Sequence, residues 1–362
     1  MSRPWALAGA TLIATLTACN AVGPSVLRSG RQDYNEVVQL TASEQLLLNL
    51  VRLRYLEPPL FLEVASVTAS YQMESGLGVG ASVPNQQSAA GTVFSPTLRA
   101  AFLEKPTISF VPLQGDKFVS QLLSPISLDK LLLLFHSGWS VERILRVCVQ
   151  RLNGVPNAPS ASGPTPAEAP DFHAFLRLAR QLRALQLKGQ LDLAAAGEED
   201  PGALLLLVDA AAEGGDELKA VRESLGAPAD ARRFVLRPGV GRGEEGRLTI
   251  QTRSLLGSLF YVSQGVRVGA DDVAEGRVPV TRITGGPAFD WDELLGDLFR
   301  VHVDESPPAG ACVSVHHRGH TFVLDDADLD SKATFAFLSQ LFALQAGNAS
   351  GQSPLLTLSV GN

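Results

Sequence analysis

The sequence predicts an α+β fold that combines helices with antiparallel hairpins. Helical periodicity, as in Ala42–Tyr55, is interleaved with two-residue alternation, as in Ala65–Val83, and no strand–helix–strand rhythm of a parallel sheet is present. A second hairpin pattern, Cys312–His317 and His320–Leu324, surrounds Arg318-Gly319. The chain is 45% hydrophobic and 19% charged, which is typical of a globular protein.

The first nineteen residues have the pattern of a secretory signal that ends in a lipobox. Arg3 gives a positive start, residues 5–16 form an apolar run, and Leu16-Thr17-Ala18 places small residues directly before Cys19. This segment resembles the signal of bacterial lipoproteins, in which the cysteine is acylated and the chain is cut before it. The resemblance implies a signal peptide over residues 1–18 and a lipid, such as palmitate, on Cys19.

The residues after the lipobox indicate where the protein would lie. Asn20 stands where the inner-membrane retention signal of Gram-negative lipoproteins has an aspartate. The sequence therefore favours the outer membrane, with the protein body on the periplasmic side and the lipid as its attachment to the membrane. The net charge is −7 and no dense Lys/Arg stripe is present, which argues against nucleic acid as a partner.

Composition divides the mature chain into four predicted segments. Residues 19–40 form a lipidated tether, and residues 41–153 hold a helix, a long β-hairpin and further helices. Residues 154–170 are rich in Pro, Ser, Gly and Ala and predict a linker or exposed loop. Residues 171–362 form an α+β domain that ends in a hairpin, a helix and a strand.

The elements follow from local patterns. Thr41-Ala-Ser-Glu44 is a capping box that predicts the start of a helix over 42–55, with a buried stripe of Leu46, Leu47, Leu50 and Leu53. Further helices are predicted at 117–123, 128–136, 140–152, 171–188, 216–225, 252–262 and 332–344. Strands are predicted at 203–208, 234–237, 247–251, 298–303 and 355–360.

The long alternating segment is the feature of the sequence that says most about function. Residues 65–83 alternate apolar and polar side chains, and residues 92–110 return with a weaker alternation after a polar link. They predict one two-faced hairpin, far longer than the usual strand of about 5–6 residues. Outer-membrane strands alternate in this way, although Glu74, Arg99, Pro96 and Pro106 interrupt the pattern. A soluble sheet with one face on a core is the alternative.

Several subunits would have to contribute such hairpins to enclose a channel. That arrangement resembles, in architecture alone, the lipoproteins of the curli-secretion channel class, in which an oligomer builds one channel from short segments.

Two short motifs have structural interpretations. Gly241-Arg-Gly243-Glu-Glu-Gly246 matches the dinucleotide pattern G-x-G-x-x-G, but a strand follows it where the motif requires a helix. We interpret it as a hairpin loop. Ser127-Leu-Asp-Lys130 matches S-x-x-K, but its companion motifs are missing, and Ser127 is better placed as a helix cap.

The histidines near the C-terminus are weak candidates for metal ligands. His316 and His317 are adjacent in a predicted strand, so they point to opposite faces, and His320 across the turn can join one of them.

An acidic run lies close by, and Asp326, Asp328 and Asp330 are weak candidates for a calcium site. An EF-hand loop counted from Asp326 would need glycine and glutamate where the chain has Ser331 and Phe337. We therefore expect no metal, cofactor or catalytic set.

Cys148 and Cys312 are the two cysteines beyond the lipobox. A disulfide between them is one interpretation, because an oxidising compartment permits it. Two buried small hydrophobic residues are the interpretation that we favour.

The segments Gly30–Tyr55 and 328–361 resemble a family of uncharacterised proteobacterial outer-membrane lipoproteins. The resemblance implies an envelope location and no catalytic residues. We therefore expect a non-enzymatic scaffold or accessory subunit of an envelope assembly, with a protein partner or further copies of the chain. Two alternatives stay open: an oligomeric pore or secretion-channel subunit that uses the 65–110 hairpin, and a periplasmic metal-dependent hydrolase.

Overall fold

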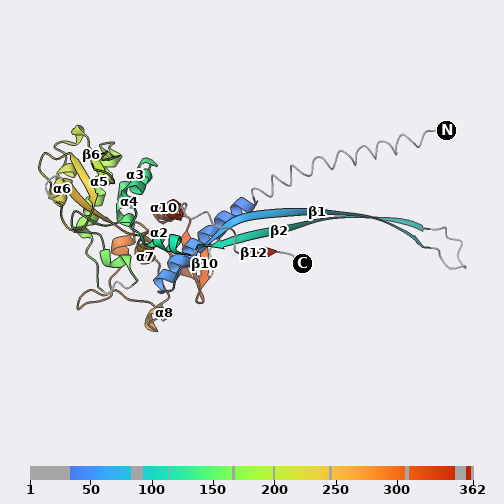
Figure 1. Cartoon of the computed structure of the whole chain (residues 1–362). Coiled ribbons are helices and arrows are strands. Elements are labelled where there is room, and N and C mark those ends of the chain that lie inside the picture. The colour runs from blue at the N-terminus through green and yellow to red at the C-terminus, as the bar shows by residue number, and fades with distance from the viewer. Residues whose placement is uncertain are drawn as a thin grey trace. The chain divides into compact units, whose positions relative to one another are not determined.

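The computed structural model describes residues 33–82, 93–113, 115–164, 168–198, 200–243, 247–305, 310–346 and 356–359. These residues fall into two compact units. The hairpin unit comprises Leu60–Gln114 and Ala349–Asn362, and the main unit comprises Met1–Pro59 and Gly115–Asn348. Helices accompany antiparallel and mixed sheets, so the predicted α+β class is confirmed (Figure 1).

The hairpin unit contains the long hairpin that the alternation predicts. Strand β1 (Leu62–Ser82) pairs antiparallel with β2 (Val93–Pro112), from Leu62↔Pro112 to Ser82↔Val93. A register shift between Val64 and Ser66 is the irregularity in this ladder. Strand β12 (Leu356–Ser359) adds antiparallel to β2 at Phe110 to Thr107 (Figure 1).

The main unit includes a helix over residues 33–54, which runs through the predicted capping box. The prediction that Thr41 starts the helix was wrong, because its hydroxyl donates to the carbonyl of Val37 at 2.9 Å inside the helix. A hydroxyl can bond the preceding turn as readily as it caps a helix. The predicted stripe is confirmed, since Leu46, Leu47, Leu50 and Leu53 are all buried.

A six-stranded sheet in the order β4-β3-β8-β7-β6-β5 lies in the main unit. Its strands are β3 (Val149–Leu152), β4 (Val155–Pro156), β5 (Leu191–Ala195), β6 (Leu204–Val208), β7 (Arg233–Pro238) and β8 (Arg247–Thr252). The strands of this sheet come from before, within and after residues 154–170, the segment that was predicted as a linker or exposed loop. The described units therefore differ from the segments that composition predicts, because a sheet joins strands that lie far apart in sequence.

Strands β7 and β8 pair in parallel, so the interpretation of residues 241–246 as a hairpin loop was wrong. The described part of this connection, residues 239–243, lies along β8: the amide of Gly239 donates to the carbonyl of Ile250 at 3.1 Å, and the hydroxyl of Thr249 donates to the carbonyl of Gly241. The amide of Gly243 donates to Oδ1 of Asn153 at 2.8 Å, and a side chain at Gly243 would collide with the carbonyl of Arg247. These contacts hold residues 239–243 against β8 and Asn153, a placement that the local sequence does not specify.

Helix α4 (Val141–Cys148) ends four residues before its predicted end, and β3 follows at once. Two side chains bind the carbonyls at this end of the helix. Asn157 Nδ2 donates to the carbonyls of Arg146 and Val149, and the guanidinium of Arg253 donates to those of Arg146, Val147 and Val149. Because helix ends leave carbonyls without partners, these donors stabilise the stop.

The remaining helices surround these elements and supply much of the core. They are α2 (Asp116–Leu123), α3 (Leu128–His136), α5 (His173–Leu187), α6 (Asp216–Leu225), α7 (Leu255–Ser263), α8 (Ala270–Ala274), α9 (Asp292–Leu295) and α10 (Leu329–Ala346), with short 3-10 turns at Pro159–Ser162 and Ala210–Ala212. In the described part of the chain, none of the helices has both the length and the apolar character that crossing a bilayer requires.

The third sheet has the order β10-β11-β9 and contains the predicted C-terminal hairpin. Its strands are β9 (His302–Asp304), β10 (Ala311–His317) and β11 (His320–Asp325). Arg318 and Gly319 form the turn with φ values of 51° and 83°. Two successive positive φ values match the twist of a two-residue hairpin, and glycine adopts the second without strain.

Cys148 and Cys312, the two cysteines among the described residues, are free. Cys148 is buried and Cys312 is exposed. Burial raises the pKa of the Cys148 thiol to about 12, and the charge of Arg253 opposes this. The expectation of two buried cysteines is confirmed for Cys148 and was wrong for Cys312.

Candidate functional site

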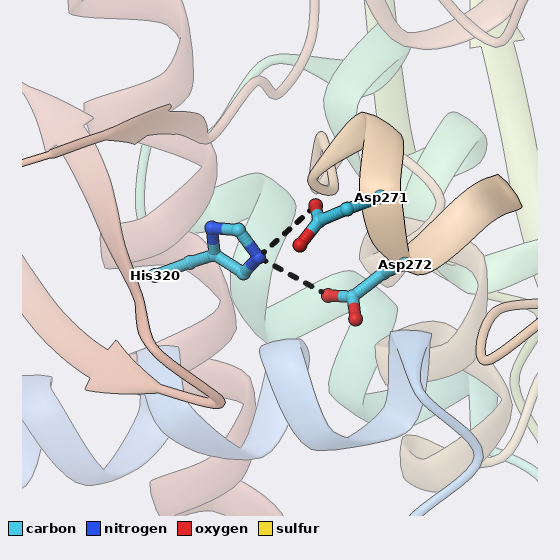
Figure 2. A group of neighbouring side chains, drawn as sticks. All are labelled: Asp271, Asp272 and His320. Atoms are coloured by element: carbon cyan, nitrogen blue, oxygen red, sulfur yellow. Dashed lines mark ion pairs between the residues drawn. The ribbon is translucent and has the colours of Figure 1, made fainter. Parts of the chain in front are cut away.

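Three segments that are distant in sequence meet at one polar cluster of the main unit. Tyr55 follows the helix over residues 33–54, Asp271 and Asp272 lie in α8, and His320 begins β11. Figure 2 shows the imidazole of His320 facing both carboxylates. We call Asp271, Asp272 and His320 the Asp-Asp-His cluster.

Asp272 is the buried centre of the cluster, with a relative exposure of 0%. The hydroxyl of Tyr55 donates to its Oδ2 at 2.6 Å, and Arg277 donates to its Oδ1 at 2.8 Å. Burial raises the pKa of this carboxyl, but the hydrogen bonds from Tyr55 and Arg277 and the nearby charge of His320 outweigh it. The net pKa lies below the ordinary value, so Asp272 is a carboxylate at neutral pH.

His320 Nε2 lies at equal distances from the two carboxylates. It is 3.4 Å from Oδ1 of Asp271 and 3.4 Å from Oδ2 of Asp272 (Figure 2). Hydrogen bonds from nitrogen to oxygen span about 2.7–3.2 Å, so neither contact has the length of a good hydrogen bond. Nε2 of His320 therefore lies close to both carboxylate oxygens but forms a short hydrogen bond with neither of them.

Gly269, which has no side chain, leaves space beside the His320 imidazole and the Asp271 carboxylate. A Cβ at this position would lie 2.7 Å from Nε2 and Cε1 of His320 and would collide with Oδ1 of Asp271. Any residue with a side chain would push the imidazole or the carboxylate away. Gly269 is also the N-cap of α8, so it both starts the helix and admits His320 beside it.

A second group of contacts holds the turn before His320. Glu57 accepts a hydrogen bond from Arg318 at 2.8 Å, and its other oxygen lies 3.2 Å from Nε2 of His317. The rings of Tyr55 and His317 pack edge to face at 5.7 Å, and the Arg318 guanidinium lies over the Tyr55 ring. Such contacts restrain the turn and the residues beside it.

The three candidate histidines separate as the strand geometry requires. His317 faces Glu57, His320 faces α8, and His316 is exposed. The structure thus joins His320, and not His316 or His317, to a pair of carboxylates. The carboxylates that the sequence suggested as metal ligands were Asp326, Asp328 and Asp330, whereas those beside His320 come from α8.

The three aspartates of the acidic run have different local partners. Asp328 accepts hydrogen bonds from the amide and hydroxyl of Ser331 at the start of α10. Asp326 pairs with Lys332 at 2.5 Å, and Asp330 pairs with Arg143 at 3.2 Å. Among the residues that the structure describes, the group that could hold a metal ion is the Asp-Asp-His cluster, and the acidic run is not part of it.

The S-x-x-K residues have structural surroundings. Ser127 occupies the N-cap position of α3 without a hydrogen bond from its side chain to the helix. Lys130 Nζ contacts Oε1 of Gln345 in α10, and burial lowers the pKa of this lysine. Nothing in these contacts brings a serine hydroxyl to the lysine amine.

An open pocket of about 540 Å³ lies near the third sheet. Its charged and polar lining includes Arg267, His302, Asp304 and Asp325. Arg267 pairs with Asp292 at 2.5 Å. The segment that contributes Arg267 and Val268 to the pocket continues directly into Gly269 and the Asp-Asp-His cluster.

Asp271 and Asp272 were not predicted as site residues, because they lie between the helix predicted at 252–262 and the strand predicted at 298–303. One local signal was available: two adjacent carboxylates follow Val268-Gly269-Ala270. Their partners, Tyr55 and His320, lie 217 and 48 positions away from Asp272 (272 − 55 and 320 − 272), so no recognisable spacing links these residues in the sequence.

The predicted lipidation site, Cys19, lies outside the described residues, and its modification stays a prediction. No protein-family model, curated protein or solved structure gives a match to this chain. The resemblance to proteobacterial lipoproteins therefore also stays a prediction from the sequence.

Proposed function

We propose that this protein is a lipid-anchored subunit of an oligomeric assembly in the bacterial envelope, held together through the β1–β2 hairpin. The observation that carries the proposal is the length of this two-stranded ladder, which runs from Leu62↔Pro112 to Ser82↔Val93. An isolated two-stranded hairpin is at best marginally stable in water. A ladder of this length gains stability when further strands pair with its edges.

Both edges of the ladder are available for such pairing in the described residues. The sheet order is β1-β2-β12, so the outer edge of β1 from Glu63 to Ser82 has no partner strand among the described residues. On β2, strand β12 covers Thr107 to Phe110, and the edge from Val93 to Pro106 has no partner strand among the same residues. Unpaired edges present backbone donors and acceptors to another chain.

Strand β12 is a precedent within the chain for this mode of assembly. It comes from the C-terminal segment and adds to β2 as an antiparallel strand. The edges of β1 and β2 are different surfaces, so pairing of β1 in one copy with β2 in the next is a heterologous contact. Repeated contacts of this kind close into a ring when the rotation permits it. Further copies of the same chain are therefore the partners that we propose.

A pore or secretion channel is a second candidate, favoured by the span of the strands. At roughly 3.3 Å per residue, a strand of twenty residues reaches about 66 Å, which exceeds the hydrocarbon core of about 30 Å. The alternation of residues 65–83 supports the same idea, because lipid would contact one face and water the other. The lipobox supports the location of such an assembly at the outer membrane.

The test compares the full chain, purified from membranes in detergent, with a shortened hairpin. In the variant, an Asn-Gly dipeptide replaces residues 73–102, so that Gln72 and Leu103 remain a closing pair across a two-residue turn. Deletion of residues 85–90, which lie between the last paired residues Ser82 and Val93, is the control. Light scattering measures the mass of each protein.

We expect a discrete oligomer for the wild type and the control, and a monomer for the shortened hairpin. A monomeric wild type, or an oligomer that survives the shortening, would contradict the proposal. Leakage of dye from liposomes separates the two candidates, because a pore loses this activity in the shortened variant, whereas an assembly without a channel has none to lose. Mass spectrometry of the N-terminal peptide, with Cys19→Ser as the control, tests the lipid anchor.

A further inference from the structure

We propose that Asp271, Asp272 and His320 form a binding site for a divalent transition-metal ion of the Zn²⁺ class. The three side chains each offer one ligand atom, and these atoms all lie within 4.8 Å of one another. Two carboxylate oxygens and one imidazole nitrogen, with water as a fourth ligand, make up a donor set that suits Zn²⁺.

The spacing of the ligand atoms matches coordination better than direct pairing. With zinc–ligand bonds of about 2.0–2.2 Å, two ligands of a tetrahedral ion lie about 3.3–3.5 Å apart. Nε2 of His320 lies 3.4 Å from each of the two carboxylate oxygens. One imidazole proton can bridge to one carboxylate at a time, whereas an ion placed between them contacts all three groups at once.

Hydrogen bonds from neighbouring side chains fix the orientation of the Asp272 carboxylate, as is usual for carboxylates that bind metals. Tyr55 donates to Oδ2 and leaves its second lone pair free, and Arg277 occupies Oδ1. Hydrogen bonds of this kind fix the direction of a ligand and tune its affinity. Because Asp272 is fully buried, its position is set before any ion arrives.

The charges around the cluster also favour a bound cation. The guanidinium of Arg277 pairs with Glu275 as well as with Asp272. A metal-bound His320 is neutral, so Asp271, Asp272, Glu275 and Arg277 leave three negative charges against one positive charge. A divalent ion would neutralise this excess, and the buried carboxylate of Asp272 is stabilised by such neutralisation.

Two further features give a metal ion access to the Asp-Asp-His cluster and space within it. The side chain of Asp271 is 59% exposed and that of His320 is 22% exposed, so an ion and its water ligand can enter from solvent. Gly269 contributes no side chain at the point where the three ligand atoms converge. A methyl group at this position would displace both His320 and Asp271.

The experiment titrates Zn²⁺ into the full chain in detergent after removal of metal with a chelator. Isothermal titration calorimetry measures the affinity and stoichiometry for the wild type, His320→Gln and Asp271→Asn. The matched control is His316→Gln, which removes an exposed histidine of the same hairpin outside the cluster. Circular dichroism verifies that each variant is folded. Asp271→Asn changes a largely exposed side chain, so it keeps the test valid if His320→Gln fails to fold.

We expect the wild type and His316→Gln to bind one Zn²⁺ per chain. His320→Gln and Asp271→Asn should each weaken binding at least tenfold, and Tyr55→Phe should weaken it about tenfold by loosening Asp272. Visible absorption of bound Co²⁺ should show tetrahedral coordination and be lost in His320→Gln. Absence of saturable binding, or equal affinity in the two histidine variants, would overturn the proposal.

Discussion

The phenol of Tyr55 donates a 2.6 Å hydrogen bond to the carboxylate of Asp272 across 217 positions of sequence. Both residues are buried, with relative exposures of 4% and 0%. The bond joins the end of the helix over residues 33–54 to α8, so it forms only when these two segments of the main unit have come together. Its loss should therefore be measurable in the stability of the folded chain.

Replacement of Tyr55 by phenylalanine should lower the free energy of unfolding by about 1–3 kcal/mol. The substitution keeps the ring that packs on His317 and Phe322 and removes one donor from a buried carboxylate. Chemical denaturation of the full chain measures the effect. A double-mutant cycle with Asp272→Asn is the control, and strictly additive effects would show that the two groups do not interact.

Acid should destabilise the protein partly through Asp272. The net pKa of this carboxyl lies below its ordinary value of 3.8, because the hydrogen bonds from Tyr55 and Arg277 outweigh the effect of burial. The unfolded chain binds this proton more tightly, so the stabilisation is present above the ordinary pKa. It is lost as the pH falls through the lower folded value.

Asp272→Asn should therefore be less stable than the wild type at neutral pH but should lose less stability between about pH 5 and pH 3. Denaturation midpoints across this range give the comparison. The exposed Asp304 of β9 provides a matched substitution, and Asp304→Asn should follow the wild-type acid limb. If Asp272→Asn and the wild type lost the same stability between about pH 5 and pH 3, Asp272 would not contribute to the acid destabilisation.

Arg253 should be among the least replaceable residues of the main unit. Its guanidinium is fully buried, bonds four backbone carbonyls and the Ser162 hydroxyl, and lies 4.0 Å from the Tyr261 ring centre. Burial lowers its pKa to about 10, opposed by smaller contributions from Tyr261 and Cys148, so it stays charged at neutral pH. Arg253→Met leaves several buried carbonyls without this donor and should cost at least about 3 kcal/mol.

Lysine at position 253 should not rescue the protein, because one ammonium cannot reproduce a planar fork of donors. Arg247→Met, at an exposed site in β8, is the matched control and should change stability by no more than about 0.5 kcal/mol. Equal losses in the two arginine variants would contradict the importance of the buried fork. Thermal and chemical unfolding both report the difference.

Cys148 and Cys312 should differ in their reaction with a thiol reagent. Cys312 is exposed and should be alkylated in the native protein. Cys148 is buried, and its pKa is raised to about 12 by burial, so it should react only after unfolding. Peptide mapping by mass spectrometry distinguishes the sites. Rapid native labelling of Cys148 would mean that the end of α4 opens readily.

Local patterns in the sequence predicted the elements whose structure is set by near neighbours. Two-residue alternation predicted the β1–β2 hairpin, and a helical stripe of leucines predicted the buried face of the helix over residues 33–54. Arg318-Gly319 predicted the turn between β10 and β11, because glycine accepts the positive φ that such a turn needs. Each of these predictions rests on a pattern among residues that are near neighbours in the chain.

Predictions failed where a distant group decided the outcome. Helical periodicity continues past Cys148, but Asn157 and Arg253 bind the last carbonyls of α4 and the chain turns into β3. Residues 241–246 were interpreted as a hairpin loop, whereas β7 and β8 run parallel and the amide of Gly243 donates to the distant Asn153. The Asp-Asp-His cluster was missed for the same reason, since its members come from separate elements.

The sequence by itself determined the α+β class, the long hairpin, the C-terminal turn and the leucine stripe, because side-chain periodicity and turn chemistry act between residues close in the chain. The tertiary structure alone decided where α4 ends, that β7 and β8 run parallel, and that His320 rather than His316 or His317 faces two carboxylates. These outcomes depend on buried hydrogen-bond donors and charges whose partners are tens to hundreds of residues away, and only the folded chain brings them within bonding distance.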